Sequence, residues 1–426
     1  MVSDEAIYRK IRWRLLPYLL LLYVVAWFDR VNVGFAALQM NADLGFSPAV
    51  FGLGAGIFFI GYALCEVPSN LILARVGARR WISRIMVSWG LVSIAMMFVR
   101  DATTFYVLRF LLGVAEAGFL PGILYYLSAW FPRGERARAV SWFMMGIPLS
   151  TVFGGPIAGL LLGMDGHSGL QGWQWLFLVE GVPAVGLGIL TWFLLPDGPD
   201  AARFLGEQER SRVQQLLAAE AQATRDRHSA RLSTALLHPT VWLLGLVLFA
   251  CQSGSYGLTL WIPQIVKRLS GQGELAVGFI SALPYVAAAV AMILVGRSSD
   301  RSGERFLHLA LPSFLGAVGF AASAFLLTPV PGMIALTIAA IGDLSTRGPF
   351  WALPPRFLTG SALAAGIALI NTMGSLGGFV GPYAVGLVRE RTGSFTGGML
   401  LLAGMLLFAG VATLALRRAK LLSGDG

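Results

Sequence analysis

The stretch LLPYLLLLYVVAWFDRVNVGFAAL, residues 15–38, decides the fold class, because it is an apolar run long enough to cross a bilayer as a helix. An acid and a base, Asp29 and Arg30, stand side by side inside it. Each ionisable side chain near the centre of a membrane helix costs about 2.5 to 3.5 kcal/mol on insertion scales. Two adjacent charges therefore indicate a water-filled path, and they predict that the chain moves something charged.

The composition of the whole chain is that of a polytopic membrane protein. Of its 426 residues, 56% are hydrophobic and only 13% are charged, whereas soluble domains carry roughly 25% charged residues. The first apolar run follows a polar, basic start and is too long for a signal peptide, so we expect it to be retained as the first helix. Both cysteines, Cys65 and Cys251, fall in predicted spans, which disfavours a disulfide framework or a metal site.

Twelve apolar runs of roughly 20 residues or more follow one another along the chain. They cover about 15–38, 48–73, 81–100, 104–130, 138–163, 173–195, 239–266, 275–296, 306–327, 331–357, 361–388 and 394–416. Arginines cluster in the connections after runs two, four and eight. By the positive-inside rule these connections and both termini are predicted to be cytoplasmic, in a bacterial-type inner (plasma) membrane. The net charge of +10 is then a topology signal and not the basic face of a nucleic-acid-binding protein.

One connection differs from the others and divides the chain in two. The segment 196–238 is polar and rich in Arg, Glu and Gln, and we expect it to be a cytoplasmic linker with an amphipathic helix around 206–221. It separates an N-terminal six-helix bundle, 1–195, from a C-terminal six-helix bundle, 239–426. A basic turn follows the second run of each half, at Arg75–Arg80 and at Gly296–Arg305, which indicates an internal repeat.

The second of these turns carries a resemblance to a known family. Gly296–Arg305 resembles the Gly-x-x-x-Asp-Arg-x-Gly-Arg-Arg loop of the major facilitator superfamily, and Arg75–Arg80 is similar to its degenerate copy without the aspartate. The resemblance covers the chain and implies an all-α polytopic membrane protein, with twelve transmembrane helices in two pseudo-symmetric six-helix bundles, the major facilitator fold. The residues implied for a cytoplasmic gating loop are Gly296, Asp300, Arg301, Gly303 and Arg305.

In such a loop, Asp300 is expected to face a helix N-terminus. The arginines would meet carboxylates or lipid phosphates and so latch the two halves together. The alternative is that these arginines only fix the topology.

A narrower resemblance is to the anion:cation symporter branch, which includes bacterial galactonate, tartrate, phthalate and hydroxyphenylacetate permeases and sialin. Four stretches carry it: Asp29–Ala36, Gly61–Asn70, Arg109–Pro121 and Phe350–Asn371. The resemblance implies that Arg30 holds a substrate carboxylate and that Asp29 and Glu116 exchange protons. It further implies that Arg109 takes part in coupling and that Tyr62 and Asn371 are polar contacts.

Helical geometry adds to this independently. Arg109 and Glu116 are seven residues apart, so they project from one face about 10 Å apart along the axis. Asp29 and Arg30 project about 100° apart, so we expect one of them to face the cavity while the other pairs with a neighbouring helix, for example Asp29 with Arg109. The alternative is a static buried network that holds helices one and four together.

Other polar and aromatic residues leave alternatives open. Asp343 and Arg347 are spaced for an intrahelical ion pair; either Arg347 contacts a second acidic group of the substrate, or Asp343 neutralises it permanently, and we favour the second reading. Glu66 and Glu180 are expected to serve helix packing. The aromatic residues that could stack on a substrate, although each alone is more typical of packing, are Tyr256, Trp261 and Trp351.

The predicted function is import of an organic carboxylate, such as a sugar acid, aromatic acid or dicarboxylate, by proton symport with alternating access. The expected partners are this small organic anion, protons and membrane lipids, with no nucleic acid, cofactor or metal. The alternatives are a proton-coupled exporter or drug antiporter, and a transporter-like sensor of organic acids that does not transport. The sequence shows no nucleophile–base pair of the kind that would indicate an enzyme. It also lacks the Gly-x-x-x-x-Gly-Lys loop that would indicate ATP-driven transport.

Overall fold

The computed structural model describes residues 3–225, 239–357 and 360–422, and in these ranges the regular elements are helices. The elements of the first half (residues 3–201) are α1 (Asp4–Asp43), α2 (Pro48–Val76), α3 (Ala78–Ala95), η1 (Met96–Phe98), α4 (Ala102–Glu116), α5 (Phe119–Ser128), α6 (Arg133–Met144), α7 (Gly146–Leu162), η2 (His167–Gly169), α8 (Gly172–Leu194) and η3 (Pro199–Ala201). They are followed by α9 (Glu207–Arg225). The elements of the second half (residues 239–422) are α11 (Pro239–Ser270), α12 (Glu274–Ser302), α13 (Phe306–Phe325), α14 (Pro329–Ser345), α15 (Arg347–Trp351), η4 (Pro354–Arg356), α16 (Gly360–Thr392) and α17 (Thr396–Leu422).

These helices account for the predicted membrane spans. Within the described residues, 11 helical segments have the length and hydropathy needed to cross a bilayer. They coincide with eleven of the predicted runs, and the remaining run, 361–388, lies in the 33-residue helix α16. The chain is therefore a multi-pass helical membrane protein.

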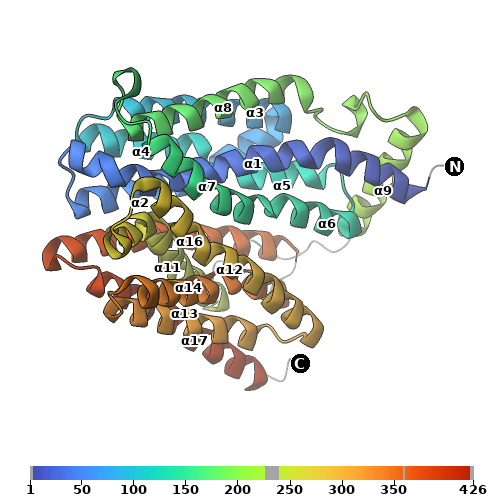
Figure 1. Ribbon diagram of the computed structural model, residues 1–426. Helices are drawn as coiled ribbons and strands as arrows, with labels where there is room; N and C mark the ends of the chain where they lie inside the picture. The colour runs from blue at the N-terminus through green and yellow to red at the C-terminus, as the bar shows by residue number, and fades with distance from the viewer. Residues whose placement is uncertain (1–2, 226–238, 358–359, 423–426) are drawn as a thin grey trace.

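The two halves form two groups of helices that pack against each other (Figure 1). Helices α1 to α8, blue to green, lie together, and helices α11 to α17, yellow to red, lie together beneath them in this view. The contacts between the groups are made chiefly by α2 with α16, α7 with α12 and α1 with α11. A polar site between the halves can therefore draw side chains from α1, α2 and α11.

Both described chain ends lie at the same end of the molecule, which we call the terminal end (Figure 1). Helix α9 corresponds to the predicted amphipathic helix. It is attached at this end to the start of α1. Lys10 binds Glu209 at 2.7 Å, and Arg212 binds Asp4 at 2.8 Å. The hydrogen bond from Lys10 lowers the pKa of Glu209 below its ordinary value. The rest of the predicted linker, 226–238, lies outside the described residues.

The predicted continuous run 138–163 is interrupted at Met145, between α6 and α7, and two further runs are interrupted beside the candidate site. The run 104–130 breaks between α4 and α5, where Gly118 has a positive φ of 86° that favours glycine. The hydroxyl of Ser69 donates to the carbonyl of Ala117 at this break, at 2.7 Å, and so replaces a lost helical hydrogen bond. The run 331–357 breaks between α14 and α15 at Thr346. Both breaks come next to charged side chains of the candidate site.

Glycines allow the two halves to touch backbone to backbone at the end opposite the terminal end. A Cβ added to Gly278 in α12 would lie 2.2 Å from the carbonyl oxygen of Gly155 in α7. Similarly, a Cβ on Gly52 in α2 would lie 2.8 Å from the carbonyl oxygen of Pro382 in α16. Small residues permit such close helix crossings in membranes. The halves are therefore in contact near the start of α2 and the end of α7.

Candidate functional site

The centre of the site is a buried ion pair between α1 and α4. Nη2 of Arg30 donates to Oε1 of Glu116, and the two side chains are 12% and 1% exposed. Nη1 of Arg30 also donates to the hydroxyl of Tyr256 on α11, at 3.4 Å. Arg30 thus links the first half to the second. The local fold explains the position of Glu116, because it is the last residue of α4 before the break at Gly118.

Aromatic rings surround the Arg30 guanidinium. Its central carbon lies 5.1 to 5.5 Å from the ring centroids of Trp27, Phe58 and Tyr62. Such cation–π contacts stabilise a cation that has little water around it. Tyr62, predicted as a polar contact of the substrate, therefore lies next to the predicted carboxylate-binding arginine.

Arg109 lies on α4 with Glu116 and is bonded to the backbone of α2. It is fully buried, and it donates to the carbonyls of Gly54 and Ala55 in α2, both at 3.3 Å. It forms no ion pair with a carboxylate of the described residues. The close approach of α2 and α4 explains this, because a Cβ on Gly113 would lie 1.9 Å from the carbonyl oxygen of Phe58. Arg109 therefore makes its hydrogen bonds to α2 and not to Glu116, and its coupling role stays a prediction.

Asp29 faces away from Arg30 and into the first half. It accepts hydrogen bonds from Nε1 of Trp89 at 2.6 Å, from the hydroxyl of Ser93, and from Nδ2 of Asn32 at 3.4 Å. The suggested Asp29–Arg109 ion pair is wrong for this structure, since Trp89 and Ser93 of α3 occupy both carboxylate oxygens. Nothing in the sequence marked these two partners, because α3 carries no recognisable motif.

The predicted intrahelical ion pair between Asp343 and Arg347 is also wrong. The helix is interrupted between them, with the backbone N–H and the hydroxyl of Thr346 both donating to the carbonyl of Asp343, at 3.2 and 2.6 Å. Arg347 instead donates to the hydroxyl of Ser255 on α11 at 2.7 Å, and Oδ1 of Asp343 has no hydrogen-bond partner among the described residues. Arg347 therefore forms no direct ion pair with Asp343, although the two side chains still attract each other electrostatically.

Asn371 and Glu66 form a contact between the two halves. Nδ2 of Asn371 in α16 donates to both carboxylate oxygens of Glu66 in α2. Glu66 thus does more than the helix packing expected of it.

Among the aromatic candidates, Trp261 is fully buried and packs edge-on against Phe51, whereas Trp351 is 39% exposed. The structure therefore places Trp261 in the core.

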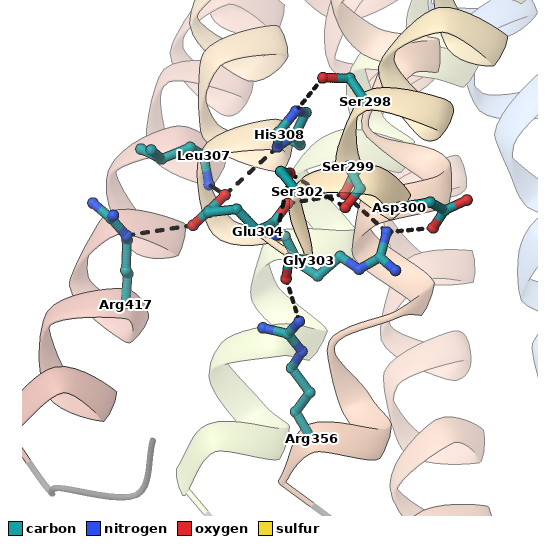
Figure 2. A network of polar contacts seen from close by, with 11 residues as sticks. Ser298, Ser299, Asp300, Ser302, Gly303, Glu304, Leu307, His308, Arg356 and Arg417 are labelled. Atoms are coloured by element: carbon teal, nitrogen blue, oxygen red, sulfur yellow. Dashed lines mark hydrogen bonds and ion pairs between the residues drawn. The ribbon is translucent and has the colours of Figure 1, made fainter.

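The predicted gating loop is mostly helical. Helix α12 runs through Gly296, Asp300 and Arg301 to Ser302, and Gly303 ends it with a φ of 67°. Asp300 does not face a helix N-terminus; it accepts from Arg305 at 2.6 Å. Instead, the carboxylate of Glu304 accepts from the backbone N–H of Leu307 at the start of α13, at 2.6 Å (Figure 2).

The contacts of this segment remain within the second half. Glu304 pairs with Arg417 of α17 at 3.4 Å, and the guanidinium of Arg356 donates to the carbonyl of Gly303 (Figure 2). For the described residues, the expected latch between the halves is therefore not formed here. Arg301 and Arg297 line a surface hollow together with Leu294, Ser298 and Ser302.

Twelve helical segments in two packed groups, with charged side chains hydrogen-bonded across the boundary and apolar side chains exposed outside, define a polytopic membrane protein of the transporter type. Comparison with known proteins makes the class specific. The family model described as the Major Facilitator Superfamily matches residues 19–382, and the chain belongs to that family. It is therefore a transporter and not an enzyme, and the twelve-helix fold implied by the gating-loop motif is confirmed.

Three similar proteins illustrate the range of this family. A protein named putative tartrate transporter from Agrobacterium vitis is 51% identical, over 98% of this chain and 92% of its own. A protein named quinolone resistance transporter from Acinetobacter baumannii is 44% identical, over 97% of this chain and 95% of its own. The crystal structure of a bacterial homologue of the human lysosomal transporter Spinster superposes with a TM-score of 0.79 at 17% identity, covering 96% of this chain and 97% of that one.

Proposed function

We propose that the chain imports a small organic acid together with protons across a bacterial inner membrane, with both termini in the cytoplasm. A short dicarboxylate such as tartrate is the first candidate. The name of the relative from Agrobacterium vitis supports the substrate class, and two arginines that meet neighbouring residues of α11 support the presence of two acidic groups.

The observation that carries this proposal is the ion pair of Arg30 with Glu116 at the boundary between the halves. An arriving carboxylate competes with Glu116 for the guanidinium, because both are planar acceptors for the same fork of donors. Once displaced, Glu116 is a buried carboxylate without a cationic partner, and such a group favours its neutral form. Substrate binding and proton uptake are therefore coupled through one arginine.

The second anchor is Arg347. Its guanidinium donates to Ser255, while Arg30 donates to the next residue, Tyr256. Arg30 comes from the first half, and Arg347 comes from the second. A substrate with a carboxylate at each end would join the halves, and the hydroxyls of Ser255 and Tyr256 could then turn to hydroxyl groups of the substrate.

Alternating access follows from the contacts between the halves. The glycine contacts of α7 with α12 and of α2 with α16 lie at the end opposite the chain termini. We propose that 1–195 and 239–426 move as two six-helix bundles, joined by the linker 196–238. Separation of the glycine contacts would open the site to the outside, and separation at the terminal end would open it to the cytoplasm.

A second candidate function is proton-coupled drug export, which the name of the relative from Acinetobacter baumannii favours. The charges at the centre weigh against a lipophilic cation, since the Arg30 guanidinium would repel it. A quinolone that carries a carboxylate is nevertheless compatible with Arg30. Assays of tartrate uptake and of quinolone extrusion by the same protein decide between the two functions.

The test uses the purified protein in proteoliposomes. We expect an imposed pH gradient, acidic outside, to drive accumulation of labelled tartrate, and we expect Arg30→Ala to abolish both accumulation and binding. Arg356→Ala is the matched control, because that arginine is exposed and its guanidinium donates to the backbone carbonyl of Gly303. Gradient-driven extrusion of quinolone without tartrate uptake would overturn import in favour of export.

A further inference from the structure

Two carboxyl groups inside the first half share one amide. Asp29 and Asn32 come from α1 and Glu180 from α8, and all three side chains are buried. Nδ2 of Asn32 donates to Oδ1 of Asp29 at 3.4 Å and also to Oε2 of Glu180. This cluster is separate from the Arg30–Glu116 pair, and the mechanism proposed above does not use Glu180.

The two carboxyl groups have unequal surroundings. Asp29 accepts hydrogen bonds from three donors, on Trp89, Ser93 and Asn32. Glu180 accepts from Asn32 alone, and its Oε1 has no partner among the described residues. Oδ1 of Asn32 is likewise buried without a partner there. The two atoms without a partner therefore belong to Glu180 and Asn32, whose side chains are already joined by a hydrogen bond.

The charged groups around the cluster do not offset a negative charge on Glu180. Arg109 of α4 attracts Asp29 electrostatically, and Glu116, itself paired with Arg30, faces the same region. Asp29 is the charged neighbour of Glu180, and it carries the same sign. An ionised Glu180 would therefore be a buried anion beside another anion, which is costly without a paired cation.

We propose that Glu180 carries a proton at neutral pH and forms a reciprocal acid–amide pair with Asn32. In this pair the O–H of Glu180 donates to Oδ1 of Asn32, while Nδ2 of Asn32 donates to Glu180. One proton then satisfies both unpartnered atoms. The opposite orientation of the amide would place its oxygen against both carboxyl groups and would remove a donor from Asp29.

The pair makes Glu180 a positioning residue for Asp29. By fixing the amide of Asn32, it keeps an N–H directed at Asp29, and a donor to a carboxylate stabilises the ionised form. Glu180 therefore sets, through Asn32, the pH at which Asp29 takes a proton. This consequence rests on the proposed function together with the proton-exchanging role that the family resemblance implies for Asp29, whereas the protonation of Glu180 rests on neither.

The protonation is tested directly by infrared spectroscopy of the full chain in lipid at neutral pH. We expect the carbonyl stretch of a protonated carboxylic acid in the wild type and its loss in Glu180→Gln. Glu274→Gln is the control, because Glu274 is partly exposed at the start of α12, pairs with Lys267 and should not contribute to this band. A band that persists unchanged in Glu180→Gln would overturn the proposal, whether or not the protein transports anything.

The positioning role is tested by the pH dependence of uptake. Glu180→Gln keeps both hydrogen bonds of the acid–amide pair, so its profile should match the wild type. Glu180→Leu and Asn32→Leu remove the pair, and the midpoint of uptake should move upward by about one pH unit, since one hydrogen bond to a charged group is lost. Size-exclusion profiles check that these variants fold. An unchanged midpoint in both leucine variants would reduce Glu180 to packing, and loss of uptake in folded Glu180→Gln would mean that an ionised Glu180 is required.

Discussion

Asn371 and Glu66 join the two halves of the transporter through a single amide group. They are 305 positions apart in the chain, and Nδ2 of Asn371 lies 2.8 and 3.0 Å from the two carboxylate oxygens of Glu66. Glu66 is buried, with 7% of the residue exposed. Helix α2 ends at Val76, at the terminal end, and Glu66 lies in its second half, whereas the glycine contact of α2 lies near its start, at Gly52. The contact with Asn371 therefore joins the halves on the side away from the glycine contacts.

Removal of one partner of this contact should therefore be more harmful than removal of both. Asn371→Leu leaves a buried carboxyl group without its donor, at a cost of about 1 to 3 kcal/mol, whereas loss of both polar groups is nearly neutral. We expect each single leucine variant to lower the apparent melting temperature and the double variant, with Glu66→Leu added, to recover most of the loss. Additive losses in this double-mutant cycle would show that the two residues act independently.

The Arg30–Glu116 pair predicts a separation of two transport activities. Glu116→Gln keeps the shape of the side chain and cannot gain or lose a proton in the relevant range. We expect proton-driven accumulation of the substrate to be abolished, while exchange of labelled for unlabelled substrate across the membrane persists. Both activities are measured in the same proteoliposomes, without and with substrate inside.

The control for this variant is Glu274→Gln, which changes a partly exposed carboxylate that pairs with Lys267 and not with Arg30. It should leave both activities intact. Equal loss of accumulation and exchange in Glu116→Gln would make Glu116 a binding or folding residue, and coupling would then have to involve Asp29 alone.

The number and order of the membrane helices could be predicted because each depends on a property of a local segment. A run of about 20 apolar residues is sufficient for a span, and arginines beside a span indicate its orientation without reference to other helices. The helical angle between Asp29 and Arg30 was sufficient to predict that they face different neighbours. These predictions needed no knowledge of what lies next to each helix.

The partners of the charged side chains could not be predicted, because they depend on how helices pack. Arg109 and Glu116 share a face of α4, yet the close approach of α2 supplies backbone carbonyls to Arg109 first. Asp343 and Arg347 have the spacing of an ion pair, but the turn tightens at Thr346, and the guanidinium of Arg347 binds Ser255 instead. Ser255 had no signal of its own besides its position next to Tyr256.

The absence of an Asp343–Arg347 ion pair leads to a prediction about the substrate. If Arg347 binds the second carboxylate of a dicarboxylate, Arg347→Ala should weaken dicarboxylate binding by about 10- to 100-fold, the value of one charge-assisted hydrogen bond. Binding of the matching monocarboxylate should change little. Calorimetric titration of both ligands measures this difference, with Arg356→Ala as the control. Equal weakening of both ligands would show that Arg347 does not distinguish the second acidic group.

The glycine contact between α7 and α12 predicts that a single methyl group shifts the conformational equilibrium. A Cβ on Gly278 would lie 2.2 Å from the carbonyl oxygen of Gly155, too close for the helices to stay in place. Overpacking of this kind costs about 1 to 3 kcal/mol, and the cost applies only while the halves touch at this end. Gly278→Ala should therefore favour the conformation that is open to the outside.

This shift can be measured with spin labels on the connections that flank the contact. Labels at cysteines introduced for His167 and Gln272, which are both exposed, report the separation of α7 and α12 after Cys65 and Cys251 have been replaced. We expect longer distances to gain population in Gly278→Ala. Gly404→Ala is the matched control, because a Cβ there meets no atom within 4 Å. If both variants gave the wild-type distances, the helices would accommodate the methyl group, and the glycine contact would not control access to the site.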